Sequence, residues 1–235
     1  MTEAPVALSF FDPASQLHGE ARAGVTLLFE GDSSTAIPGG PTVEERGEGY
    51  SATLEDRFEL AFSPVSPTLE LAGARSRVCE VTGRVGEREV RCLGIATETV
   101  SPPAWAELDA VRSLAALFDE ENVVLAVARR PRGAQGHGEE LVTSLLISAG
   151  ELLDVEEARI STVYDGEGRQ RSVGLELWLP GEDFPRRVFG EVVAGTSLAL
   201  DGLDVHAAVF GWKMDGREGA GAYDLMVRSE PPEAA

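Results

Sequence analysis

The chain has 235 residues, of which 43% are hydrophobic and 26% are charged, and its formal net charge is −20. This charge argues against nucleic-acid binding, because phosphate recognition needs a basic surface, and against docking on anionic membrane. It is most simply explained by solubility. No apolar run approaches the roughly 20 residues of a membrane helix. The segment 1–11 has no basic residue and so does not read as a secretory signal. We therefore expect a cytoplasmic protein without a membrane-inserted segment.

The first part of the chain predicts short β-strands separated by turns. The stretch 31–50 is rich in Gly, Pro, Ser and Thr and predicts a surface loop. Strict alternation in 76–83 and 88–99 predicts a hairpin of two half-buried strands. Further strands are expected at 6–11, 18–30, 50–54, 57–62 and 67–71.

The two cysteines of the chain are Cys79 and Cys92. Without a nearby pair of histidines they do not make a zinc site. If a tight turn were centred on Val85-Gly86, they would face each other across a hairpin, and a disulfide would depend on the register. In a reducing compartment we expect two free, half-buried thiols.

The character of the sequence changes at residues 101–112. Ser101 is a candidate helix N-cap and Pro102 a candidate first helical residue. A short helix followed by a strand at 123–128 is the preferred prediction. A strand at 112–118, in a hairpin with 123–128, is the alternative.

Short strands with Gly-containing turns continue to the end of the chain, which is typical of an antiparallel sandwich or barrel. The residues 229–235 predict a disordered tail. Strands are expected at 139–147, 157–164, 171–179, 186–194, 203–214 and 221–228, with turns that include 165–168, 181–183, 201–202 and 215–216.

A weak internal repeat relates the segments 85–98 and 215–224. Each has a turn with Gly and Arg, and then a Gly followed by a carboxylate. If the repeat is a duplication, the chain holds two related β halves. The expected domains are then an N-terminal half at 1–100, a connecting segment with the short helix at 101–112 and a C-terminal half at 113–228.

The last predicted hairpin, at 212–224, has three glycines that allow close approach of the backbone to another segment. With other short motifs, it resembles the lipocalin-like family that includes the carotenoid 1,2-hydratases, the AttH-type proteins and related pericyclases. Asp224 stands where that family often has Glu. The residues that carry the resemblance are Asp12-Pro13, Leu17-His18-Gly19, Val81-Thr82-Gly83-Arg84-Val85, Gly94, Trp105 and Trp212-x-x-Asp215-Gly216-x-x-Gly219-x-Gly221-x-Tyr223-Asp224.

The resemblance implies an all-β, antiparallel lipocalin-like barrel or sandwich with a hydrophobic pocket for a polyene, isoprenoid or polyketide. Some members hydrate an alkene by protonating it from an acidic residue, and others only hold a reactive substrate in a productive shape. Neither activity needs a cofactor or a metal.

Several side chains could carry such chemistry. A buried carboxylic acid has a raised pKa and can donate a proton, and aromatic faces stabilise a developing carbocation. Asp224 and Tyr223 are the candidate catalytic residues. Packing in the core is the competing interpretation for the aromatic residues, and an ion pair with Arg171 or Arg187 is the competing one for Glu176. The candidate ligand-binding residues are Trp212, Phe210, His206, Trp178, Glu176 and Trp105.

Other chemistries are disfavoured by the motifs. The run 137–140 (His-Gly-Glu-Glu) lacks a second histidine at helical spacing and predicts a solvated loop. We find no nucleophile elbow, phosphate loop or dinucleotide fingerprint. The leading hypothesis is a protein that binds a hydrophobic small molecule and hydrates, cyclises or rearranges it. A non-catalytic carrier and an interaction protein with a filled core are the alternatives.

Overall fold

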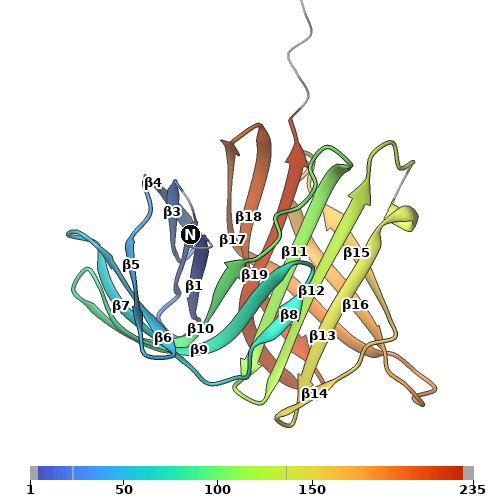
Figure 1. Ribbon diagram of the computed structural model, residues 1–235, viewed down its shortest axis with the longest axis horizontal. Coiled ribbons are helices and arrows are strands. Elements are labelled where there is room, and N and C mark those ends of the chain that lie inside the picture. Colours follow the sequence, from blue (N-terminus) through green and yellow to red (C-terminus); the bar gives the residue numbers. More distant parts are fainter. Residues whose placement is uncertain (1–4, 23, 136, 230–235) are drawn as a thin grey trace, which may run out of the picture.

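The computed structural model describes residues 5–22, 24–135 and 137–229 and is almost entirely β-structure. Figure 1 shows two curled antiparallel sheets side by side, one from each half of the chain. Within the described residues, helical structure is limited to the 3₁₀ turn η1 (His137–Glu139). None of the helices in this part of the chain is long and apolar enough to cross a membrane.

The first sheet contains the strands β1 (Val6–Asp12), β2 (Leu17–Arg22), β3 (Val25–Glu30), β4 (Ser33–Pro38), β5 (Thr42–Arg46), β6 (Gly49–Leu54), β7 (Phe58–Pro64), β8 (Leu69–Leu71), β9 (Ala74–Val85) and β10 (Arg88–Thr99). The second contains β11 (Leu108–Asp119), β12 (Asn122–Pro131), β13 (Leu141–Ser148), β14 (Glu151–Leu153), β15 (Glu157–Tyr164), β16 (Gln170–Trp178), β17 (Arg186–Leu200), β18 (Leu203–Met214) and β19 (Arg217–Arg228).

The two sheets share one topology. The first has the order β4-β3-β2-β1-β10-β9-β7-β6-β5, with β8 paired to β9, and the second has β14-β13-β12-β11-β19-β18-β17-β16-β15. If β8 is set aside, each strand of one sheet has a counterpart in the other, and the first strand of each half pairs with the last. The repeat segments at 85–98 and 215–224 fall in the corresponding hairpins β9–β10 and β18–β19. The prediction of an all-β fold with two related halves is confirmed.

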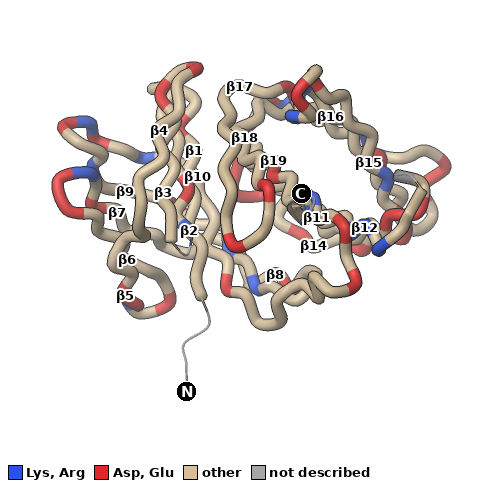
Figure 2. Tube along the Cα trace, turned by 90° about the horizontal axis from the view of Figure 1, so that it is seen from above, with Lys and Arg blue, Asp and Glu red and all other residues tan. Residues whose placement is uncertain are grey.

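The second sheet curls further than the first. β13 comes close to β15 near the two ends of the strand order. Viewed from above, the backbone trace of this half forms a ring (Figure 2). We call this half the C-terminal barrel.

The predicted connecting helix is wrong. The segment 101–107 contains turns, and β11 begins at Leu108 and forms a long hairpin with β12. Consecutive apolar residues of β11, such as Ala110 and Val111, point to opposite faces of this strand. The alternative hairpin was therefore the correct interpretation, and the second sheet begins inside the segment assigned to the connection.

Two other predictions, of one strand and of one loop, also need correction. The stretch 18–30 is not one strand but the hairpin β2–β3, which turns near Gly24, a residue with a φ of +84°. The stretch 31–50 is not a loop, because it contains β4 and β5 at the two edges of the first sheet. Their side chains are mostly exposed, so the polar composition reflects edge strands.

The β18–β19 hairpin explains the glycines of the last motif. Asp215 and Gly216 have φ values of +50° and +77°, as a two-residue hairpin turn of type I′ requires. A Cβ atom on Gly221 would lie 1.9 Å from the carbonyl oxygen of Ala115, and one on Gly219 would lie 2.3 Å from that of Leu117. These glycines therefore allow β19 to approach β11 closely, as predicted.

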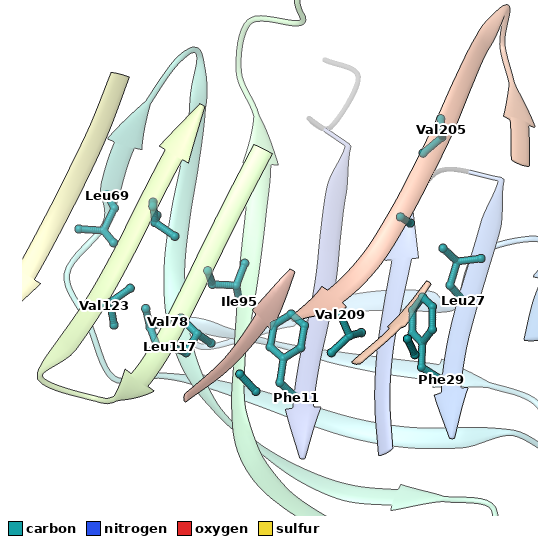
Figure 3. Packing of buried hydrophobic residues seen from close by; sticks show 14 of the residues in the cluster. Phe11, Leu27, Phe29, Leu69, Val78, Ile95, Leu117, Val123, Val205 and Val209 are labelled. Carbon is teal, nitrogen blue, oxygen red and sulfur yellow. The ribbon is translucent and has the colours of Figure 1, made fainter. Parts of the chain in front are cut away.

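Buried side chains form three apolar clusters, one inside each curled sheet and one between the sheets. The strands of both halves alternate, so that one face lines the inside of its own half and the other faces the opposite half. Figure 3 shows the cluster between the sheets, where Phe11, Leu27 and Phe29 of the first sheet approach side chains of the second. This packing joins the two halves.

The cysteines are not paired. Cys79 lies opposite Gly94, and Cys92 lies opposite Val81, so the register does not place the two side chains face to face. Both thiols are free; Cys79 is buried and Cys92 is half-buried.

Candidate functional site

A cavity of about 410 Å³ lies between the two halves. Its walls come from β1, β2, β9 and β10 of the first sheet, from β11, β12 and β19 of the second, and from the connecting segment. Most of the lining side chains are apolar, for example Ile95, Val111 and Met226. The volume is in the range of small-molecule sites, which are largely apolar with a few convergent polar groups.

The polar groups converge where β2 meets β19. Arg22 forms an ion pair with Glu20 on its own strand and another with Asp224 of the C-terminal half. The side chains of Glu20, Arg22 and Asp224 are 15%, 16% and 10% exposed, and all three line the cavity. The Oδ1 atom of Asp224 is buried without a hydrogen-bond partner among the described residues. One arginine therefore holds two carboxyl groups against the cavity.

Glu20 has an unusual protonation equilibrium. Burial raises the pKa of its carboxyl from 4.5 to about 7; the charge of Arg22 opposes this shift and the charge of Asp224 adds to it. Near neutral pH, a large fraction of Glu20 is therefore protonated and can donate a proton. Perturbed carboxyl groups in a cavity are typical of acid–base sites.

The structure places Asp224 and Tyr223 on opposite faces of β19. Asp224 lines the cavity, whereas Tyr223 is fully buried inside the C-terminal barrel. Its hydroxyl lies 2.7 Å from Oγ1 of Thr162 and 3.4 Å from Nη1 of Arg112. Arg112 also pairs with Glu140, and the side chains of that pair are each only 2% exposed. Consecutive residues of a strand point to opposite faces, so the two candidate catalytic residues do not share a site.

The interior of the C-terminal barrel is filled by apolar side chains, which include the aromatic residues Phe210, Trp212 and Tyr223. Phe210 and Trp212 are 0% and 1% exposed, with ring centroids 5.5 Å apart, and the centroids of Phe210 and Tyr223 are 5.3 Å apart. None of these three residues lines the cavity between the halves. In this structure they form the core of the barrel.

His206, Trp178 and Glu176 also lie away from the cavity. Nδ1 of His206 is 2.7 Å from Oγ of Ser197, in an exposed position. Trp178 and Glu176 lie on the face of β16 opposite the barrel core. Glu176 forms an ion pair with Arg187, with Oε1 3.2 Å from Nε, which is one of the two pairings considered for it.

Trp105 is the candidate ligand-binding residue that the structure brings to the cavity, together with Asp224. It is half-buried in the connecting segment, and its carbonyl oxygen accepts a hydrogen bond of 3.2 Å from Nη1 of Arg228. Sequence reasoning did not identify Glu20 and Arg22. The available signal was a Glu and an Arg two residues apart, and so on the same face of one strand.

The fold is that of AttH-type lipocalin-like proteins, as comparison with solved structures shows. One match is a crystal structure assigned as AttH from Nitrosomonas europaea, with a TM-score of 0.58 and 13% identity, over 97% of this chain and 93% of the other. Another is kievitone hydratase from Nectria haematococca, with a TM-score of 0.59 and 9% identity, over 97% and 89% of the two chains. No family model matches the sequence, and no curated protein does. The predicted resemblance is confirmed for the fold.

Proposed function

We propose that this protein binds an apolar, unsaturated small molecule in the cavity between its halves and adds water to a carbon–carbon double bond by acid catalysis. The observation that carries the proposal is the pair of carboxyl groups, Glu20 and Asp224, held by Arg22 in a mostly apolar wall. A structural neighbour named as a hydratase supports the reaction class. The substrate class is an isoprenoid, a polyene or a polyketide, and we place the reaction in the cytoplasm.

In the proposed reaction, the carboxylic acid of Glu20 donates its proton to the less substituted alkene carbon. The π electrons form the new C–H bond and leave a carbocation on the neighbouring carbon. The negative charge of Asp224 and the aromatic face of Trp105 stabilise that cation. A water molecule then forms the C–O bond and releases a proton to the carboxylate of Glu20, either directly or through Asp224, which restores the starting state.

The same acid could start a cyclisation if a second double bond of the substrate captured the cation before water did. The choice between these outcomes depends on whether water or carbon lies next to the cation. The proposal therefore keeps hydration as the main reaction and cyclisation or rearrangement as its variant. A non-catalytic carrier would bind the same ligands without any product.

Native mass spectrometry of the purified protein and of its organic extract would show a bound apolar molecule. Turnover would then be measured with a panel of isoprenoid alcohols, polyenes and polyketides, and a product would gain the mass of one water. Glu20→Gln and Asp224→Asn should each lower turnover by about 10²-fold or more, because general acid–base groups contribute that much. Glu176→Gln, on the outside of the barrel, is the control and should leave turnover unchanged.

Full turnover in Glu20→Gln would remove Glu20 as the acid, and full turnover in Asp224→Asn would remove Asp224 from the mechanism. Binding without a product in the wild-type protein would favour the carrier. If no member of the panel bound, the ligand-site proposal would be wrong.

A further inference from the structure

The cavity contains a second arginine, Arg129, some distance from the carboxyl pair. Across β19, β11 and β12, Asp224 lies in one row with Ser113 and Val127. Arg129 is two residues further along β12, on the same face and in the next row. Strand and residue spacings place the Cα atoms of Asp224 and Arg129 about 12 Å apart.

The two cavity arginines differ in their partners. Arg22 pairs with two carboxyl groups. Arg129 donates a hydrogen bond from Nη2 to the carbonyl oxygen of Ala72, and its Nε is buried without a partner. Within the described residues, no carboxylate forms an ion pair with Arg129. It therefore brings to the cavity wall a positive charge that no carboxylate of the described residues neutralises, and a guanidinium is suited to bind a carboxylate.

We propose that Arg129 binds the carboxylate of the substrate, and that the substrate is an unsaturated carboxylic acid whose double bond lies at Glu20 and Asp224. This inference rests on the proposed hydration at that site. At about 30 Å³ of liquid volume for each water-sized group, the 410 Å³ cavity holds about a dozen heavy atoms. A branched acid of ten carbons has this size.

Because the protein carries a large negative charge, its affinity for a carboxylate depends on the local contact with Arg129. A net charge of −20 does not attract an anion from a distance. The affinity for a carboxylate must therefore come from the local contact with the guanidinium. An acid and an alcohol with the same carbon skeleton should then differ in affinity, and this difference should depend on Arg129.

The test compares citronellic acid with citronellol, which share one trisubstituted double bond and differ in the carboxylate. Binding is measured by calorimetry, and hydration by mass spectrometry, on the full chain. The wild-type protein should bind the acid about tenfold or more tightly than the alcohol, as one charge-assisted contact allows. Arg129→Gln should remove this preference and leave citronellol binding unchanged. Arg130→Gln is the matched control, because Arg130 follows on the same strand, points to the opposite face and does not line the cavity.

Equal affinity for the acid and the alcohol in the wild-type protein would overturn the inference, as would an acid preference that survives in Arg129→Gln. Hydration of citronellol that depends on Glu20 would leave the proposed function standing in either case. If neither compound bound, this substrate class would be wrong, and the proposed function would be judged on the wider panel.

Discussion

The structure contains two buried arginine clusters with similar chemistry and different surroundings. In the C-terminal barrel, Arg112 is enclosed by Glu140, Thr162 and Tyr223 within a packed apolar core. Between the halves, Arg22 holds two carboxyl groups at the wall of a cavity. An arginine–carboxylate cluster alone therefore does not mark a site. Free volume beside the polar atoms separates the candidate site from a structural network.

The largest expected effect is on stability and lies in the barrel cluster. Glu140→Ala leaves the buried guanidinium of Arg112 without its carboxylate, and we expect the free energy of unfolding to fall by about 3–5 kcal/mol. Urea denaturation followed by tryptophan fluorescence measures the change. Glu139→Ala, at an exposed neighbour, should cost less than about 1 kcal/mol. A small loss in Glu140→Ala would show that Arg112 is not held as described.

The second prediction concerns the pH dependence of stability at the cavity cluster. The folded-state pKa of Glu20 is about 7 and its ordinary value is 4.5. Folding therefore favours the protonated form. The associated stabilisation is fully present below pH 4.5 and is lost as the pH rises through about 7. Its size is about 3 kcal/mol.

Glu20→Gln is neutral at every pH and should not show this loss. The unfolding free energy of the wild-type protein, minus that of Glu20→Gln, should therefore fall as the pH is raised from about 4.5 to about 8. Denaturation curves at a series of pH values measure it. A difference that stays constant over this range would contradict the raised pKa.

The smallest expected effect is on stability and concerns Tyr223, which lies on the face of β19 opposite Asp224. Tyr223→Phe removes a hydroxyl that contacts Thr162 and Arg112, and it should lower the free energy of unfolding by about 1–2 kcal/mol. Because Tyr223 points into the barrel, ligand binding and turnover at the cavity should be unchanged. Loss of turnover in a folded Tyr223→Phe protein would instead support a catalytic role for Tyr223.

Local patterns predicted much of this fold. Asp-Gly pairs at 201–202 and 215–216 lie at hairpin turns, and period-two alternation at 76–83 and 88–99 marked a real hairpin. The helix prediction at 101–112 failed because Ser-Pro is also suited to a loop before a strand. The loop prediction for 31–50 failed because edge strands need few apolar residues, so their polar composition is similar to that of a loop.

The candidate site was harder to predict than the fold. Asp224 was identified through the family resemblance, but Glu20 and Arg22 lie about 200 residues earlier in the sequence, and only the packing of the two halves brings them to it. Period-two alternation does separate Tyr223 from Asp224, because neighbouring residues face opposite sides of a strand. It gives no information on which of the two faces borders free volume.

The apolar cluster between the sheets has a consequence for how the chain folds. Each half has a complete strand order and its own inner core, as an autonomous module would. Yet the outer face of the first sheet carries Val25, Leu27 and Phe29, all buried against the other half. A half produced alone would expose this face to water and would tend to self-associate. The two halves are therefore obligate partners, and they should unfold as one cooperative unit rather than in two stages.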